Sequence, residues 1–364
     1  MKTIFKTIVI ISAICLTSIN VTSQCKAETK EFQCTQIVMS DCNTQIYLPD
    51  ITTGIVEGRV IGKLQKNSAG KLEIFTSAED EREINGSYHE TLKRHVVSSA
   101  GRKTTLNYRY KSDTAYGLPV YCKTEEGKKS LLAISVNYKK AKIRIETVSK
   151  NGKVLQTITD NNKSFTNDGY AVIYDTWEKH NNLYYIYRKT SCDYNKLFIR
   201  TVNKKSLKGK THTIKDKSFK RMKRHISSVK GEEEFKYHNG KIYALTKDSI
   251  KIYSVKGKKT GEYKLPDGGI SFYDEKTDDP DNGVLVYYDF SINGDYIYYV
   301  NTSGIYRCNI KKDNGFELYY NASNDKNFNK TKGISDICFI DENTFYILYD
   351  AGHPVMYLME YKAL

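Results

Sequence analysis

The chain has 364 residues, 39% of them hydrophobic, and carries a formal net charge of +15 at pH 7. A chain of this size can bury a large core, which leaves either two ordinary domains or one large all-β domain. Thirty Tyr residues beside one Trp and five Pro favour strands over helices. No stretch after the N-terminus is apolar enough to span a bilayer, so we expect a mature protein without a transmembrane segment.

The first 27 residues have the pattern of a secretory signal peptide. Two lysines form a positive n-region, residues 8–19 form an apolar h-region, and Ala27 ends a segment suited to cleavage. The alternative, a retained membrane anchor, is disfavoured because the apolar run is short and interrupted by hydroxyl side chains. We therefore expect a signal peptide over residues 1–27, a single domain over residues 28–364, and a secreted or cell-surface location.

Six cysteines remain after this cleavage, namely Cys34, Cys42, Cys122, Cys192, Cys308 and Cys338. An even number in an exported chain permits disulfides, and the closely spaced Cys34 and Cys42 are the first pair to test. Cys122, Cys308 and Cys338 lie within predicted strands, where cysteines usually pack as small hydrophobic residues. Paired Cys-x-x-Cys motifs do not occur in the sequence, so a structural zinc site is not expected.

The first strand-rich unit covers residues 54–112 and is the least regular. Residues 72–75 follow a turn at Gly70 and predict a strand. Residues 78–94 are mostly polar, so we expect either a long loop or a short helix there.

The next four units each contain four predicted strands bounded by turn residues. In the second and third units we expect strands at 118–123, 131–137, 142–148, 154–159, 170–175, 183–189, 196–202 and 211–214. In the fourth and fifth we expect them at 234–237, 241–246, 250–255, 261–265, 284–290, 295–300, 305–309 and 316–320. Asn239-Gly240, Asn293-Gly294 and Asn314-Gly315 lie between these strands, and such pairs are strong hairpin signals because type I′ turns require positive φ.

The sixth unit has only three predicted strands, at 334–340, 344–349 and 355–361, before Leu364. An incomplete sheet would leave unpaired backbone groups at its edge. Residues 32–39 are a suitable fourth strand from the other end of the chain. We therefore expect the N-terminal segment of the mature chain to pair with the last unit.

Corresponding positions in the six units recur at intervals of 49 to 59 residues, at Leu72, Leu131, Leu183, Ile242, Tyr296 and Phe345. A period near fifty with four strands is typical of a β-propeller. The sequence thus predicts an all-β fold, a six-bladed β-propeller of four-stranded antiparallel blades closed by the N-terminal strand. Trp177 follows the first strand of the third unit and is expected to pack between blades.

Two motifs, Asn239-Gly-Lys-Ile-Tyr243 and Asn293-Gly-Asp-Tyr-Ile-Tyr298 with Gly304-Ile-Tyr-Arg307, resemble blades of the NHL, YVTN and TolB-like superfamily of six-bladed propellers. The resemblance covers roughly residues 115–361 and concerns architecture, because these motifs specify hairpins. Members of that superfamily include binding scaffolds, sensors and some enzymes. The resemblance therefore implies a fold and leaves the function open.

Propeller topology places the blade-to-blade connections on one face, usually the ligand face. The connection after the third unit is basic, and its candidate anion-binding residues are Lys217, Lys220, Arg221, Lys223, Arg224 and His225. Lys and Arg form charge-assisted hydrogen bonds with phosphate and sulfate groups. The alternative is a solvated loop whose charge only keeps the protein soluble.

The connection after the fourth unit is acidic, and its candidate calcium ligands are Asp274, Asp278, Asp279 and Asp281. The clustered carboxylates leave calcium open as a cofactor. The run contains Pro280 and lacks the spacing of an EF-hand, so the sequence does not predict an EF-hand site. The alternative is that the acidic connection partly neutralises the basic one. His353, in a turn of the last unit, should lie on the same face and is a further candidate for ligand binding.

The sequence contains neither a nucleophile elbow nor a phosphate-binding P-loop, so no catalytic residue is predicted. Our first hypothesis is an exported, non-enzymatic propeller that binds an anionic cell-wall polymer or acidic glycan on its loop face. The alternative is a propeller enzyme, a lactonase-like hydrolase or polysaccharide lyase, with a metal in the acidic connection. A third reading, a module of a larger surface assembly, predicts an exposed apolar patch.

Overall fold

The computed structural model describes eighteen segments of the chain, which are residues 29–36, 59–60, 64–67, 69–84, 87–98, 101–112, 119–124, 130–137, 140–165, 171–189, 196–219, 235–266, 289–301, 303–312, 314–325, 328, 333–350 and 356–364. The regular structure of these segments consists of β-strands apart from a short 3₁₀ turn over residues 217–219 and a single 3₁₀ residue at Pro266. Within them, no helix is long and apolar enough to cross a membrane.

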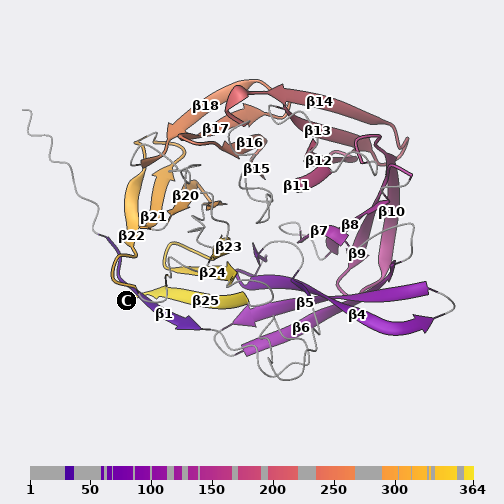
Figure 1. Cartoon of the computed structure of the whole chain (residues 1–364), viewed down its shortest axis with the longest axis horizontal. Coiled ribbons are helices and arrows are strands. Elements are labelled where there is room, and N and C mark those ends of the chain that lie inside the picture. Colours follow the sequence, from indigo (N-terminus) through magenta and orange to yellow (C-terminus); the bar gives the residue numbers. More distant parts are fainter. Residues whose placement is uncertain are drawn as a thin grey trace, which may run out of the picture.

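The strands form six antiparallel sheets arranged as blades around a common centre (Figure 1). Blade 1 contains β2 (Arg59–Val60), β3 (Gln65–Lys66), β4 (Leu72–Ile84), β5 (Ser87–Ser98) and β6 (Gly101–Ser112). Blade 2 contains β7 (Pro119–Thr124), β8 (Ser130–Asn137), β9 (Lys142–Ser149) and β10 (Val154–Asn161). Blade 3 contains β11 (Ala171–Lys179), β12 (Asn182–Lys189), β13 (Lys196–Asn203) and β14 (Gly209–Lys215).

The remaining blades follow in chain order around the ring. Blade 4 contains β15 (Phe235–His238), β16 (Lys241–Leu245), β17 (Ser249–Ser254) and β18 (Lys259–Lys264). Blade 5 contains β19 (Asp289–Asn293), β20 (Tyr296–Asn301), β21 (Gly304–Asn309) and β22 (Glu317–Asn321). Blade 6 contains β23 (Gly333–Phe339), β24 (Thr344–Asp350), β25 (Met356–Ala363) and β1 (Phe32–Gln36). The predicted six-bladed propeller is confirmed.

The two ends of the chain close the ring, as predicted. β1 pairs antiparallel with β25 from Phe32 opposite Ala363 to Gln36 opposite Met359. The backbone N–H of Leu364 also donates to the carbonyl of Glu31, at 3.0 Å. Blade 6 therefore has its fourth strand, and β25 has no open edge.

The expectation of a loop or short helix over residues 78–94 is wrong. β4 and β5 form a hairpin in which pairing runs from Leu72 opposite Val97 to Ile84 opposite Ser87, with one irregularity. β5 also pairs with β6 along its other edge. Backbone hydrogen bonds to two neighbouring strands stabilise β5 whatever the polarity of its side chains, and a count of polar residues does not detect that pairing.

Two of the predicted Asn-Gly turns form tight two-residue hairpins, but they do so differently. Asn239 and Gly240 both have positive φ, at 46° and 80°, as a type I′ turn requires. In blade 5 the pair Asn293–Tyr296 closes the hairpin, so the central residues are Gly294 and Asp295 and only Gly294 is at positive φ. The hairpin was predicted correctly there, whereas the turn residues were displaced by one.

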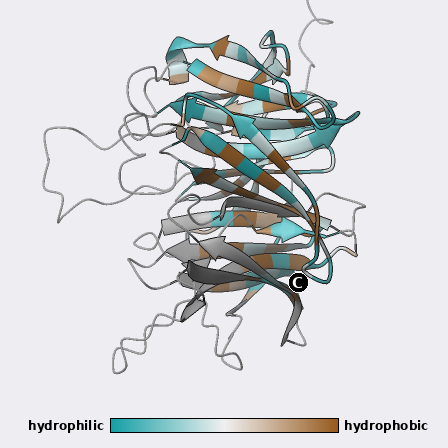
Figure 2. Ribbon diagram, turned by 90° about the vertical axis from the view of Figure 1, so that its right-hand side faces the viewer, coloured by the Kyte–Doolittle hydropathy of each residue, from teal (hydrophilic) through white to brown (hydrophobic). Residues whose placement is uncertain are grey.

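Over the part of the chain that the structure describes, the hydrophobic core forms six clusters, each at the seam between two neighbouring blades. One cluster joins blade 6 to blade 1, so side-chain packing between neighbouring blades runs around the whole ring, whereas strand pairing stays within each blade. Figure 2 shows hydrophobic stretches along the strands and hydrophilic residues at many of the turns. Such a core is built by repetition, because each blade buries its two faces against its neighbours.

Trp177 packs between blades, as predicted, although it lies within β11 and not after it. Its ring stacks on Tyr237 of blade 4 at a centroid distance of 3.9 Å. Cys308 and Cys338 are buried within β21 and β23, which confirms them as core residues. Cys34 carries a free thiol in β1, and Cys42 lies outside the described residues.

Candidate functional site

The candidate site lies at the end of the ring where the blade-to-blade connections leave the outer strands. In blades 2, 4 and 5 the first residue after the outer strand donates its N–H to the turn between the second and third strands: Asn162 to Ala141, Leu265 to Asp248, and Ala322 to Ser303. Connections and these turns therefore share one end, which we call the connection face. The opposite end carries the other turns, as the bond from Ile310 N–H to the Asp295 carbonyl indicates.

Most of the residues predicted for this site lie outside the described residues. These are Lys220, Arg221, Lys223, Arg224, His225, Asp274, Asp278, Asp279, Asp281 and His353. Lys217 is described and its side chain is exposed. Lys217 belongs to the short 3₁₀ turn that begins the basic connection, so the structure defines how that connection starts.

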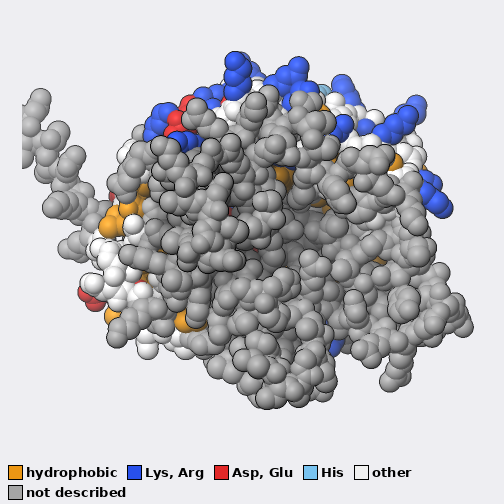
Figure 3. All heavy atoms as spheres, in the orientation of Figure 1, with side chains coloured by type: hydrophobic (Ala, Val, Ile, Leu, Met, Phe, Trp, Pro, Cys, Tyr) orange, Lys and Arg blue, Asp and Glu red, His pale blue; other side chains and the backbone are white. Residues whose placement is uncertain are grey.

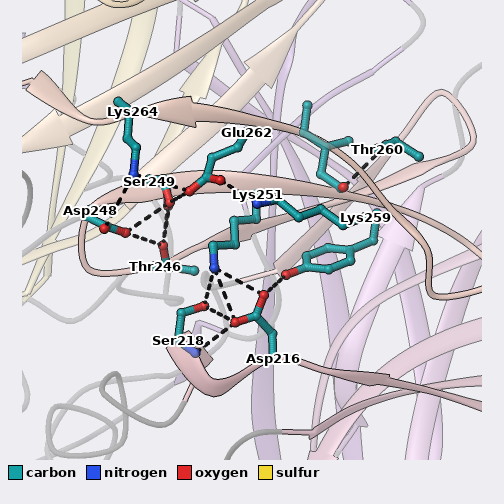
Figure 4. Close-up of polar contacts among 12 residues, drawn as sticks. Asp216, Ser218, Thr246, Asp248, Ser249, Lys251, Lys259, Thr260, Glu262 and Lys264 are labelled. Atoms are coloured by element: carbon teal, nitrogen blue, oxygen red, sulfur yellow. Dashed lines mark hydrogen bonds and ion pairs between the residues drawn. The ribbon is translucent and has the colours of Figure 1, made fainter.

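Asp216 holds the base of the basic connection against blade 4 (Figure 4). Its Oδ1 accepts the backbone N–H and the hydroxyl of Ser218, at 2.8 and 2.7 Å. Its Oδ2 accepts the hydroxyl of Tyr253 at 2.6 Å, and the Lys251 ammonium lies 3.2 Å from the same oxygen. The carboxylate thus ties residues of the connection to two side chains of β17.

The pKa of Asp216 is lowered to about 2. Partial burial by itself raises this pKa, but the hydrogen bonds from Tyr253, Ser218 and Lys251 favour the ionised form and outweigh burial. Burial raises the pKa of the Tyr253 hydroxyl, and the hydrogen bond to Asp216 raises it further. Asp216 is therefore ionised and Tyr253 protonated at neutral pH, and neither is poised for proton transfer.

A second polar network borders the first on blade 4 (Figure 4). The Ser249 hydroxyl donates to Glu262 at 2.7 Å, and Lys259 donates to the same carboxylate. Lys264 lies 3.7 Å from Asp248 and 3.6 Å from Glu262. The hydrogen bond and charge of Lys259, opposed by burial, lower the pKa of Glu262 to about 2, so this carboxylate is ionised at neutral pH.

A third network ties blade 2 to blade 3 at the same face. Arg200 donates to both oxygens of Asp160, from Nε at 2.9 Å and from Nη2 at 2.7 Å. The Tyr185 hydroxyl donates to Asp160 Oδ2 at 2.7 Å, and the Asn162 amide donates to Tyr185 at 2.9 Å. Asp160 and Asn162 are buried. The bidentate pair of Arg200 with Asp160 therefore holds the two blades together, and the Asp160 carboxylate is not open to a ligand.

Sequence reasoning missed a short motif that recurs where these connections begin. Asn162-Lys-Ser-Phe165 follows β10, Asp216-Lys-Ser-Phe219 follows β14, and Asp325-Lys-Asn-Phe328 lies after β22. Each of the three Phe rings is buried in a seam between blades, at no more than 4% exposure. The sequence signal is an Asx-Lys-Ser/Asn-Phe repeat, which strand periodicity does not reveal because it lies in the connections.

The first two copies, here called the Asx-Lys-Ser-Phe turns, are folded alike. Asn162 Oδ1 accepts the N–H of Ser164 at 3.1 Å, as Asp216 Oδ1 accepts that of Ser218. The Phe N–H donates to the carbonyl of the first residue in both, at 3.0 Å in the first turn and 3.3 Å in the second. The first side chain also contacts a tyrosine hydroxyl of the next blade, Tyr185 or Tyr253. Two neighbouring connections therefore start with the same structure.

Three aspartates occupy corresponding positions on the innermost strands and have structural roles. In Asp175, Asp289 and Asp336, Oδ1 accepts the N–H of the following residue, at 2.6 to 2.8 Å. Asp175 Oδ2 accepts Tyr237 N–H at 2.7 Å, and Asp336 Oδ2 accepts Leu64 N–H, each from the next blade. Asp289 lies 3.4 Å from the Lys236 ammonium of blade 4, so all three carboxylates contact a neighbouring blade. Among the described residues no group of three His, Cys, Asp or Glu side chains is placed to hold a metal ion.

Cationic side chains gather on the outer edge formed by β14 and β18 (Figure 3). The exposed lysines of these two strands are Lys210, Lys215, Lys259 and Lys264. Lys on outer strands discourages edge-to-edge pairing with other sheets, which gives this charge a structural reason independent of any ligand. Among the described outer strands, the largest exposed apolar group is the pair Val154 and Leu155 on β10.

Neither a family model nor a curated protein sequence matches the chain. Among solved structures, the chain is similar to the WD40 domain of Neurospora crassa Pan2, with 9% identity over 92% of this chain and 96% of that one, at a TM-score of 0.43. It is also similar to an α-L-arabinanase of Penicillium chrysogenum complexed with arabinobiose, with 8% identity over 91% and 98%, at a TM-score of 0.46. The β-propeller domain of the Trilobed protease from Pyrococcus furiosus has 10% identity over 84% and 93%, at a TM-score of 0.41. These likenesses concern the fold.

Proposed function

We propose that the chain is an exported, non-enzymatic β-propeller that binds an anionic polymer, a cell-wall polymer or an acidic glycan, on its connection face. The observation that carries this proposal is the start of the basic connection. Asp216 holds it to β17, while the next residue, Lys217, is exposed. Lys220, Arg221, Lys223 and Arg224 follow within seven residues of Lys217.

An anchored base favours binding because a loop that is already fixed at one end loses less conformational freedom when a ligand orders it. The Lys251 charge and the Tyr253 hydroxyl are satisfied by Asp216, so they do not compete for a ligand. Lys and Arg side chains of the kind that follow in the sequence form charge-assisted hydrogen bonds with phosphate, sulfate or carboxylate groups. Binding of this kind weakens as salt concentration rises.

Two finer assignments belong to the same proposal. We infer that residues 1–27 direct export and are removed, and that the blades resemble those of the NHL, YVTN and TolB-like superfamily. Mass spectrometry of the protein secreted by an expressing cell tests the first, with Glu28 as the expected N-terminal residue. A mature chain that keeps residues 1–27 would contradict it.

The function is tested by binding of the chain from Glu28 onward to teichoic acid, a sulfated glycan and DNA, at low and moderate salt. The test variant carries Lys220→Glu, Arg221→Glu, Lys223→Glu and Arg224→Glu. The matched control carries the same charge change on exposed lysines of the opposite end, Lys150→Glu, Lys153→Glu, Lys256→Glu and Lys258→Glu. We expect salt-sensitive binding of one polymer that the test variant loses and the control largely keeps.

Equal losses in the two variants would show that only net charge matters, and the proposal would fail. Absence of binding to every polymer would also overturn it. The same titration with added calcium and with a chelator tests the acidic connection with Asp274, Asp278, Asp279 and Asp281. A calcium-dependent change in affinity or in thermal stability is the result expected if an ion binds there.

A further inference from the structure

The two Asx-Lys-Ser-Phe turns divide their residues between the fold and the solvent. Asn162 and Asp216 bind a serine N–H and a tyrosine hydroxyl, and Ser164 lies 3.2 Å from the Tyr187 hydroxyl. Phe165 packs on Tyr187 at a centroid distance of 5.3 Å. The first, third and fourth positions of the motif are therefore needed to seal the seam between two blades.

The second position has no such task. Lys163 and Lys217 are both exposed, and within the described part of the chain neither ammonium forms an ion pair or hydrogen bond. Each lysine is held between residues whose side chains are fixed by the seam, so the backbone that carries it is rigid. At this second position the fold needs only a residue that can adopt the turn conformation. Both turns nevertheless carry a lysine.

The two lysines also lie on the same face. Each follows the outer strand of its blade, β10 in blade 2 and β14 in blade 3, and these blades are neighbours in the ring (Figure 1). The repetition of the turn places Lys163 and Lys217 at equivalent positions one blade apart. Two lysines attached at equivalent positions one blade apart match a ligand whose negative charges are also repeated along its length.

We propose that Lys163 and Lys217 form a two-point contact for a linear polymer that carries regularly spaced anionic groups, each lysine binding one group. This inference rests on the proposed function and specifies its ligand class, a repeating polyanion rather than a single small anion. Binding at the second lysine becomes intramolecular once the first is occupied, so affinity should depend on polymer length. The hydrogen-bonded turns keep the backbones of the two lysines in place before binding, which lowers the part of the entropic cost that comes from the backbone.

The test uses the chain from residue 28 with Lys163→Glu, Lys217→Glu and the double variant. Lys150→Glu, at the opposite end of β10, is the matched control, and Lys163→Gln separates loss of charge from reversal. The probes are inorganic polyphosphates of graded length, with poly(glycerol phosphate) and heparin as further arms that distinguish the source of the anionic groups. Dissociation constants are measured over a salt series.

We expect each single lysine reversal to weaken binding to a long polymer about fivefold or more and to reduce the salt slope by about one. The wild-type chain should bind a long polymer much more tightly than a short one, and the double variant should lose that dependence on length. The midpoint of thermal unfolding should be unchanged in all variants, because the Lys163 and Lys217 side chains form no hydrogen bond or ion pair within the described part of the chain. Lys150→Glu should have a smaller effect than Lys163→Glu.

Equal affinities of Lys163→Glu and Lys150→Glu, or an affinity independent of polymer length, would overturn the two-point contact. Loss of binding only in the variant of Lys220, Arg221, Lys223 and Arg224 would leave the proposed function standing and remove this inference. If no polymer binds the wild-type chain, both fail together. Lys163 decides between these outcomes because it lies outside the basic connection.

Discussion

Two seams of the propeller are sealed by aromatic rings that come from different parts of the chain. Between blades 3 and 4, Trp177 stacks on Tyr237, and Phe219 from the connection packs on Phe235 at 5.2 Å. Between blades 5 and 6, Phe32 from the N-terminal strand packs on Tyr320 and Phe345, at 5.3 and 5.0 Å. Phe32 is more than 280 residues from the rings it touches.

The same repeated architecture is thus held by two kinds of contact, one between consecutive parts of the chain and one between its two ends. The seam between blades 3 and 4 needs only residues that follow one another in the chain, so it can form as soon as those blades exist. The seam between blades 5 and 6 needs both ends of the chain, since β1 supplies a strand and a ring to blades that are made last. Removing β1 should therefore affect the whole ring, whereas changes at the other seam should act locally.

The largest effect is expected for a chain that starts at residue 37 and lacks β1. It loses the ladder to β25 and the Phe32 ring, whose truncation alone, as Phe32→Ala, should cost about 3 kcal/mol. The exposed edge of β25 should also promote association between molecules. Urea unfolding and size-exclusion chromatography measure these two effects. A truncated chain as stable and as monomeric as the longer one would show that the ring does not depend on closure.

A smaller but still large effect is expected for Phe219→Ala at the seam between blades 3 and 4. The ring is 1% exposed and packs on Phe235 and Tyr253, so its loss should lower the free energy of unfolding by about 3–5 kcal/mol. Phe165→Ala, in the equivalent turn of the preceding seam, should cost a similar amount. Lys217→Ala serves as the control, with little change in denaturant midpoint. Widely different costs for the two Phe residues would contradict the equivalence of the turns.

The next effect concerns Asp216 and acid. Its pKa is about 2 in the fold and 3.8 ordinarily, so the ionised carboxylate stabilises the fold fully above pH 4 and loses that contribution as pH falls towards 2. Asp216→Asn should cost about 1–3 kcal/mol at pH 7, because Tyr253 and Lys251 lose a charged acceptor. Its unfolding free energy should change less between pH 4 and pH 2 than that of the wild type. An unchanged pH slope in the variant would refute the role assigned to this carboxylate.

The smallest effect is expected at Lys264. Its side chain is 72% exposed and lies 3.6 Å from Glu262 and 3.7 Å from Asp248. Exposed ion pairs are screened by water and salt, so Lys264→Ala should change the unfolding free energy by less than about 0.5 kcal/mol. Thermal unfolding at low and high salt measures it. A loss above about 1 kcal/mol would show that the second network of blade 4 is a structural anchor like the first.

The candidate site could be anticipated only in part. Lys217 was named from the basic run and is exposed at the connection face, but Lys163 was missed because a single lysine in a loop has no charge cluster to mark it. Its significance depends on the equivalence of two turns that are 54 residues apart. The contacts of Asp216 could not be predicted from the sequence either. Tyr253 and Lys251 belong to a different blade, and nothing in their local sequence indicates that they contact this carboxylate.

The sequence by itself determined the number of blades, the positions of most strands and the closing role of the N-terminal strand. It did so because hairpin turns and alternating hydrophobic residues are local signals, and because an incomplete last unit requires a strand from elsewhere. Only the tertiary structure decided that residues 78–84 and 87–94 belong to strands, since polar β5 is held by backbone bonds to β4 and β6. It alone also decided which Asx, Ser and Phe residues seal the seams, because those contacts join residues of neighbouring blades that come together only when the ring is packed.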